Sequence, residues 1–450
     1  MKRLLAIVFA LIMGLAWTLP SLAVEFSGQY RLRGEYRDNA DFTDDTVDGN
    51  AFYGQRIRLT AKANPTDDVK VKVTIQDTRE WGEFSNVGPA ATNGGPRLTE
   101  VNSSASEHNY ELDIHEGWLQ IDNVFGSPLA VRVGRQELVY GDQRLIGAFG
   151  WSNNGRSFDA IKFMYRSDAF DVDFWTSKVV ERGTNNDQDF YGVYTTIKTV
   201  PAWLIDLYVL LVNDGSGQAT FNNTGTIAGV NDTNLWTYGV RAKGKVGPVD
   251  LTVEVPFQSG DMEVTGGSDY DISAWAYAID LGYTIPGAPM GLRVGGQYIF
   301  ASGDDNPNDT DIDTFSNLYP TNHMHYGYAD QQGWRNVKAW NLNAIAQVTP
   351  KTSVRLDYWD FALDEEADCW YGAGNWMNSA CAGVRNANTN WDDKVGSEVD
   401  ITVKHKYNSA VAFQFGYSRF FAGDRLDDAL GTGVDADDLD WAYFQVLGNY

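Results

Sequence analysis

Hydrophobic and polar residues alternate along most of the chain. From residue 26 to residue 37, one parity holds Phe26, Gly28, Tyr30, Leu32, Gly34 and Tyr36, and the other holds Ser27, Gln29, Arg31, Arg33, Glu35 and Arg37. A β-strand places alternate residues on opposite faces. The same pattern recurs in segments that begin near Val69, Phe170, Ile205, Val249, Leu292, Val354, Val399 and Val411. These segments run for about ten residues, longer than the five or six usual in soluble sheets and enough to cross a bilayer at a tilt.

The connections between these segments also alternate, between short turns and long loops. Eight short turns are expected, at 64–68, 123–128, 167–168, 200–201, 246–248, 285–289, 350–351 and 408–409. Nine long polar loops are expected, at 38–50, 82–108, 139–157, 181–188, 213–233, 260–271, 302–338, 364–394 and 422–438. Short periplasmic turns and long external loops are typical of outer-membrane barrels. The 17 connections predict an all-β transmembrane antiparallel β-barrel of 18 strands.

Both ends of the chain agree with export to an outer membrane. Lys2 and Arg3 precede an apolar run and the small-residue site Ser21-Leu22-Ala23, so residues 1–23 are predicted to be a signal peptide. Residues 24–450 then form one barrel domain. The chain ends in Tyr450, with apolar residues at alternate positions before it, as in the final strand of such barrels. Outer-membrane lipid is therefore an expected partner.

Composition and charge exclude several classes of protein. The chain has 60 acidic and 35 basic residues and a net charge of -25, which argues against nucleic acid as a partner. Removing Lys2 and Arg3 makes that charge -27. A mean hydropathy of -0.34 is too polar for a helical membrane protein, and 13% aromatic residues argue against disorder.

If the apolar parities face lipid, the opposite parities line the lumen. They place cations inside, because a cation on the lipid side costs roughly 2 to 4 kcal/mol at the midplane. These cations are Arg31, Arg33, Arg56, Arg58, Lys70, Lys72, Lys162, Arg293, Arg355 and Lys404. Acids on the same parities include Glu35, Asp173, Asp206, Glu254, Asp357, Glu398 and Asp400. The cations either brace the wall or form a path in which guanidinium groups pair with carboxylates of a solute.

Two blocks of sequence resemble the alginate-export porins. The first runs from Val133-Gly134-Arg135-Gln136-Glu137-Leu138 through Tyr140-Gly141-Asp142-Gln143-Arg144 to Arg156-Ser157-Phe158-Asp159. The second runs from Ala301-Ser302-Gly303-Asp304-Asp305 to Gly327-Tyr328-Ala329-Asp330. The resemblance implies an 18-stranded barrel with an arginine-lined lumen that passes an anionic polyuronate. It also implies a constriction formed by Arg135, Asp142, Arg144, Arg156 and Asp159, with loop 139–157 folded partly inward.

Arg135 tests the parity argument. Alternation from Val131 and Val133 sends Arg135 toward lipid, whereas the resemblance makes it a lumen residue. We therefore predict a β-bulge near Gly134 or Arg135 that turns the side chain inward, because bulges re-aim side chains.

Other candidate chemistry lies mainly in the loops. Asp304, Asp305, Asp309, Asp311 and Asp313 gather oxygen ligands in one loop, so calcium is its candidate cofactor, although the EF-hand pattern is absent. No other cofactor or metal is expected. His323 and His325 could bind a metal, but a structural role fits better. Cys369 and Cys381 share one external loop, which predicts a disulfide.

The chain is thus predicted to be a porin and not an enzyme. Asp113 and His115 could supply an acid and a base, but no nucleophile elbow accompanies them. The leading solute is alginate or a related anionic polysaccharide, or a small anionic solute. The alternatives are a general small-solute porin, and a barrel that docks a periplasmic partner such as a secretion or electron-transfer protein.

Overall fold

The computed structural model describes residues 23–43, 49–81, 112–181, 187–215, 230–306, 309–373, 392–430 and 435–450. Eighteen strands form the wall of a closed barrel. They are β1 (Val24–Asp38), β2 (Asn50–Thr66), β3 (Val69–Glu80), β4 (Asp113–Ile121), β5 (Leu129–Gln136), β6 (Phe158–Arg166), β7 (Phe170–Val180), β8 (Gln188–Ile197), β9 (Trp203–Asp214), β10 (Val230–Val246), β11 (Val249–Val264), β12 (Tyr270–Thr284), β13 (Arg293–Ala301), β15 (Val337–Thr349), β16 (Thr352–Ala362), β17 (Lys394–Lys406), β18 (Val411–Ala422) and β19 (Leu439–Asn449).

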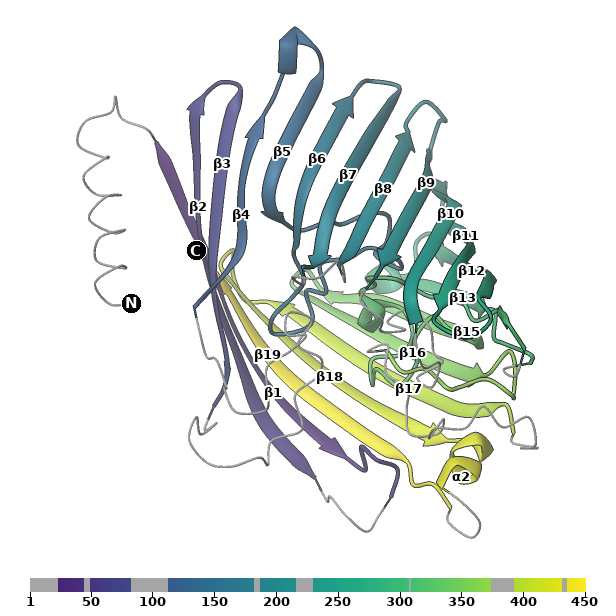
Figure 1. Cartoon of the computed structure of the whole chain (residues 1–450). Helices are drawn as coiled ribbons and strands as arrows, with labels where there is room; N and C mark the ends of the chain where they lie inside the picture. Colours follow the sequence, from purple (N-terminus) through teal and green to yellow (C-terminus); the bar gives the residue numbers. More distant parts are fainter. Residues whose placement is uncertain are drawn as a thin grey trace.

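The remaining elements are short. β14 (Asp311–Ile312) pairs in parallel with β12 from within the loop after β13. The single-turn helices η1 (Val124–Gly126), η2 (Pro289–Gly291) and η3 (Asn322–Met324) and the helix α2 (Asp424–Leu430) lie in connections. Figure 1 shows α2 at the end of the barrel opposite the short turns of β5–β9. In the part of the chain that the structure describes, no helix is long and apolar enough to cross a membrane.

The strands follow one another round the wall in chain order, and each pairs antiparallel with the next (Figure 1). β1 pairs with β2 on one side and with β19 on the other, so the first and last strands close the ring. Closure leaves no strand edge with unpaired backbone groups, which a bilayer would penalise. The predicted 18-stranded antiparallel barrel is confirmed.

Most of the predicted connections are found where the sequence places them. The predicted loop 260–271 is an exception, because β11 extends to Val264 and β12 begins at Tyr270. Gly260, near the end of the β11–β12 pairing, lies so close to β10 on its other side that a side chain there would meet the carbonyl oxygen of Asn234. A glycine, which favours turns, thus marks a tight approach of strands here.

The two faces of the wall divide by parity. On β9, Leu207 and Val209 are about half exposed, while Asp206 and Tyr208, on the opposite parity, are buried. The exposed apolar set recurs round the barrel and forms its outer surface. The buried polar set faces the interior, where two loops fold inward and cover it.

Candidate functional site

Loop 137–157, between β5 and β6, crosses the interior of the barrel. At one wall its Asp142 forms ion pairs with Arg241 (2.8 Å) and Lys243 (2.7 Å) of β10. Burial raises the pKa of Asp142, but these two cations outweigh burial and lower the pKa to about 2. Tyr140 donates a hydrogen bond to Asp173 of β7 (2.8 Å) and stacks on Trp175. This end of the loop is therefore fixed to the wall by charge and by aromatic packing.

The other end of loop 137–157 lies against β1 and β2, on the side of the ring opposite β10. Arg31 donates hydrogen bonds to the carbonyl oxygens of Gly150 (2.8 Å) and Ser152 (2.9 Å). Arg56, its cross-strand neighbour, donates to the same two oxygens (3.1 and 3.0 Å). Both arginines are predicted lumen residues, and both are almost fully buried, at 2% and 5% exposure. They hold the backbone of the loop.

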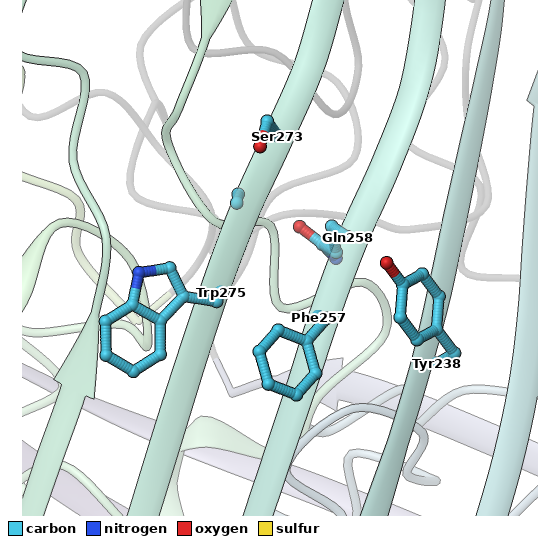
Figure 2. A pocket seen from close by; sticks show the side chains of 6 residues that line it. Tyr238, Phe257, Gln258, Ser273 and Trp275 are labelled. Atoms are coloured by element: carbon cyan, nitrogen blue, oxygen red, sulfur yellow. The ribbon is translucent and has the colours of Figure 1, made fainter.

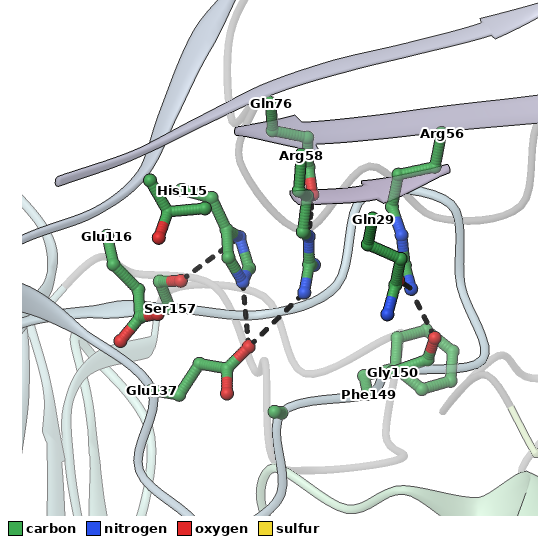
Figure 3. A network of polar contacts seen from close by, with 12 residues as sticks. Gln29, Arg56, Arg58, Gln76, His115, Glu116, Glu137, Phe149, Gly150 and Ser157 are labelled. Carbon is green, nitrogen blue, oxygen red and sulfur yellow. Dashed lines mark hydrogen bonds and ion pairs between the residues drawn. The ribbon is translucent and has the colours of Figure 1, made fainter. Parts of the chain in front are cut away.

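Arg33 and Arg58 complete the arginine cluster on this wall. Arg33 donates to the carbonyl oxygen of Trp151 (2.8 Å), pairs with Glu35 (2.6 Å), and lies over the Trp151 ring. Arg58 lies 3.5 Å from Glu137, which also accepts a hydrogen bond from His115 (2.8 Å). Figure 3 shows Arg56 and Arg58 side by side, one directed to Gly150 and the other to Glu137.

His115 reaches Glu137 because of a β-bulge. In the pairing of β3 with β4, Thr74 lies opposite Glu116 and Ile75 lies opposite Ile114, so His115 is the extra residue. His115 and Glu116 are consequently both buried on the inner side. Asp113, the predicted acid partner of His115, instead lies 3.8 Å from Arg135. The acid–base pair suggested by the sequence therefore does not form.

Loop 302–336 lies against loop 137–157. Arg156 donates to the carbonyl oxygen of Pro320 (2.9 Å), and Arg144 donates to the Tyr326 hydroxyl (3.2 Å). Burial lowers the pKa of Arg156 to about 10, but the guanidinium still carries its charge at neutral pH. A backbone bridge joins Ile146 to Tyr319. The two loops thus form one layer. Arg144 and Arg156 join the loops through these hydrogen bonds.

Side chains of β17 and β11 hold loop 302–336. Glu398 of β17 accepts a hydrogen bond from the backbone N–H of Ala329 (2.8 Å). On β11, Gln258 exchanges two hydrogen bonds with the backbone of Ser316 (2.7 and 2.8 Å). Arginines thus bind the carbonyls of one loop, while a carboxylate and an amide bind the backbone of the other.

Other predicted lumen cations are paired with acids. Arg293 contacts Asp250 (2.5 Å) and Asp280 (3.4 Å), and Arg355 contacts Asp357 (2.6 Å). Lys70 pairs with Asp122 at 2.6 Å. Lys404 differs, because it is exposed on the inner face of β17 and has no ion-pair partner within the described ranges.

Arg135 does not enter the lumen, so the predicted bulge is wrong. β5 pairs with β4 and β6 without a register shift through Gly134 and Arg135. Arg135 lies opposite Asp159 and forms a bidentate ion pair with its carboxylate (2.9 and 2.8 Å). Asp159 shares its parity with the outward residues Ile161 and Phe163. Arg135 and Asp159 therefore lie on the outer face, at the long-loop ends of their strands, and cannot form a constriction.

The outward pair sits where its charges are tolerated. Asp159 lies opposite Lys178 of β7, and Lys178 pairs with Asp187 (2.7 Å) and Asp189 (3.0 Å). This charged row lies beyond the apolar residues of the same strands, so it sits above the apolar band of the barrel. Cations near the edge of that band cost only about 0 to 1 kcal/mol, much less than at the midplane.

The remaining predicted sites are structural or stay open. His323 donates a hydrogen bond from Nδ1 to Asp330 (2.9 Å) and stacks on Trp151, in keeping with a structural role. No group of three or more His, Cys, Asp or Glu side chains in the described ranges could hold a metal ion. Residues 307 and 308 of the candidate calcium loop lie outside these ranges, and calcium stays a prediction. Cys381 also lies outside them, as do residues 1–22, so the Cys369–Cys381 pairing and the signal peptide stay predictions.

A hollow on the outer face is distinct from the lumen. It measures about 360 Å³ and is lined by Tyr238, Phe257 and Trp275, together with Gln258, Ser273 and Ala274. Figure 2 shows the three aromatic side chains on neighbouring strands. Because these rings are exposed on the apolar face, the hollow borders lipid and not the solute path.

Solved structures with a similar fold include two proteins of Pseudomonas aeruginosa, OccK9 (OpdG) and the outer membrane protein OprD. OccK9 (OpdG) has a TM-score of 0.59 and 12% identity, over 95% of this chain and 98% of that one. OprD has a TM-score of 0.56 and 12% identity, over 94% of both chains. At these identities the likeness shows the fold alone. Among curated proteins, no sequence matches this chain.

The sequence itself gives the family. The model of the family described as Alginate export matches residues 23–436. That match covers nearly the whole barrel, including both inward loops. The chain therefore belongs to the alginate export family, and it is an outer-membrane porin.

Proposed function

We propose that this porin gives passive passage to anionic solutes, with alginate or a related polyuronate as the leading solute. The observation that carries this proposal is the pair Arg31 and Arg56. Both face the lumen, and both donate to neutral carbonyl oxygens rather than to a carboxylate. Within the described residues neither has an ion-pair partner, so their charges remain available to attract an anion.

Lysines near the short-turn end of the lumen support the same selectivity. Lys62 on β2 and Lys404 on β17 lie on inner-face positions four residues or fewer from the ends of their strands at the short turns, and neither has an ion-pair partner in the described part of the chain. Lys243, on β10, is about half exposed although it contacts Asp142. A polyanion arriving from the periplasm would meet these cations first. The many acids of the external loops lie at the opposite end.

A general small-solute porin is the second candidate. Most inner cations are neutralised by nearby acids, as in the pairs Arg293–Asp250 and Arg355–Asp357, and a balanced lumen would select by size. In both candidate functions the barrel is a channel without enzymatic activity. The separation of Asp113 from His115 supports this part of the proposal.

Planar-bilayer recording separates the two candidates. The reversal potential in a salt gradient reports anion preference, and a polyuronate added to the periplasmic side reports entry of the polymer. A neutral glucan of equal length is the matched control for size. We expect anion preference and current blockades with the polyuronate alone. Equal blockades with both polymers, and no anion preference, would favour the general porin.

A further inference from the structure

Two carbonyl oxygens of loop 137–157 sit between two lumen guanidinium groups. The oxygens of Gly150 and Ser152 each accept hydrogen bonds from both Arg31 and Arg56, at 2.8 to 3.1 Å. A carboxylate bound to arginine likewise has its two oxygens held by paired N–H donors. The loop therefore presents to these arginines what an anionic solute would present, but without the negative charge.

The arginines are incompletely satisfied by the loop. The Nε atoms of Arg31 and Arg56 are buried and have no hydrogen-bond partner among the residues that the structure describes. A buried donor left unpaired carries a desolvation cost. A carboxylate that approached from the side of Nε and Nη would satisfy that donor and add a charge-assisted bond, which is stronger than a bond to a neutral carbonyl.

We propose that segment 150–152 occupies a carboxylate site formed by Arg31 and Arg56. A polyuronate displaces this segment when it enters the lumen, an inference that rests on the proposed function. The neutral segment keeps the site closed to water and small solutes. The polymer replaces it with carboxylates, and no covalent bond changes.

The rest of the loop sets the extent of this motion. Asp142 stays fixed to Arg241 and Ile146 stays bridged to Tyr319. Arg156 stays fixed to loop 302–336, so the segment between Ile146 and Arg156 moves while its ends are held. Trp151 opposes the motion, since it stacks between Arg33 and His323. A single carboxylate competes poorly against this stack. A polymer supplies several carboxylates at high local concentration, so displacement favours polyanions over small anions.

A disulfide between wall and loop tests the displacement. A side-chain carbon at Gly54 of β2 would lie 3.2 Å from Cγ of Asn153, so cysteines at both positions fall within bonding range. The test compares Gly54→Cys/Asn153→Cys in oxidised and reduced form, with Asn153→Cys alone as the matched control. Single-channel recording counts polyuronate blockades and measures the reversal potential.

We expect oxidation to reduce blockade frequency by at least about tenfold while anion preference persists. Equal blockade frequency in both forms, with anion preference intact, would overturn the displacement and leave the proposed function standing. Absence of blockades and of anion preference in the unmodified channel would overturn the proposed function and this inference with it.

A second variant removes the hydrogen bonds that hold segment 150–152. Arg31→Gln/Arg56→Gln frees segment 150–152 without polymer, so small-ion conductance should rise while polyuronate blockades become rarer. Arg135→Gln is the matched control, because it removes an arginine from the outer face. Heat-modifiable migration on gels shows that each variant is folded. Unchanged conductance in a folded Arg31→Gln/Arg56→Gln channel would contradict the proposal.

Discussion

The carboxylate of Asp142 and the guanidinium of Arg241 lie 2.8 Å apart, on the wall opposite the arginine cluster of β1 and β2. Arg241 also pairs with Asp206 at 2.6 Å. One loop is thus tied by a charge at one wall and by its backbone at the other. This arrangement makes Asp142 the principal anchor of the end that stays fixed.

Asp142→Asn should loosen this anchor. The substitution removes the negative charge that Arg241 and Lys243 share, while Arg241 keeps Asp206, so the wall itself should stay intact. Loss of a charged partner of a buried group costs about 1 to 3 kcal/mol. We expect faster proteolysis within loop 137–157 and higher conductance. Asp159→Asn, on the outer face, is the control, and equal proteolysis of the two variants would contradict the anchoring role.

Acid should weaken the contact between the two inward loops. His325 contacts the carbonyl oxygen of Asp142 through Nε2 (2.6 Å), and burial, aided by Arg144, lowers the pKa of His325 well below its usual 6.5. The folded protein therefore favours the neutral form of His325. The contact contributes its full stabilising free energy above pH 6.5. That contribution falls as the pH falls below 6.5, by at most about 1.4 kcal/mol per pH unit.

Hydrogen exchange of loop 302–336 between pH 7.5 and pH 5 measures this effect. His325→Gln keeps an N–H donor but does not titrate, so its exchange should depend less on pH. An equal pH dependence in the two proteins would assign the effect to another group.

The strands could be predicted because each one faces two different solvents. Lipid outside and a polar lumen inside force alternation at every strand, as Asp206, Leu207 and Tyr208 show on β9. The same alternation correctly placed Arg31 and Arg56 on the inner face. It also sent Arg135 outward, and the bulge invoked to reverse that direction was the error.

The contacts of the two inward loops could not be predicted from the alternation of hydrophobic and polar residues. Arg31 meets Gly150, 119 residues away, through a backbone carbonyl that every residue possesses. Sequence carries no signal for such a contact. Arg241, which no motif marked, became the partner of Asp142 for the same reason. The bulge at His115 was likewise hidden, because an inserted residue leaves only a local break in alternation.

Arg135→Ala should leave ion selectivity unchanged. Its side chain pairs with Asp159 on the outer face and is well exposed, so it does not touch the solute path. Exposed ion pairs contribute about 0 to 1 kcal/mol to stability. The reversal potential should match that of the unmodified channel, and the thermal midpoint should fall only slightly. A shifted reversal potential would place Arg135 in the lumen after all.

The external loop after β16 should contain a disulfide between Cys369 and Cys381. The chain has only these two cysteines, and an exported loop meets oxidising conditions. Peptide mapping of protein unfolded and alkylated without reductant should recover one cross-linked peptide pair. Alkylation of both thiols in that experiment would refute the pairing. Cys369→Ser/Cys381→Ser should speed proteolysis of this loop while leaving the barrel folded.

Lys404→Gln should reduce the preference of the channel for anions more than Lys70→Gln does. Both lysines face the lumen near the short-turn end, but Lys70 is already paired with Asp122 at 2.6 Å. Removing Lys70 therefore also frees a carboxylate, whereas Lys404 has no ion-pair partner in the described residues to compensate for its loss. The long-range field of Lys404 weakens with salt over a Debye length of about 10 Å at 0.1 M. The difference in reversal potential between the two variants should accordingly shrink as salt rises from 0.1 to 1 M. A salt-independent difference would instead indicate that Lys404→Gln acts by changing the shape of the pore, and Lys404 would then lie outside the selectivity path.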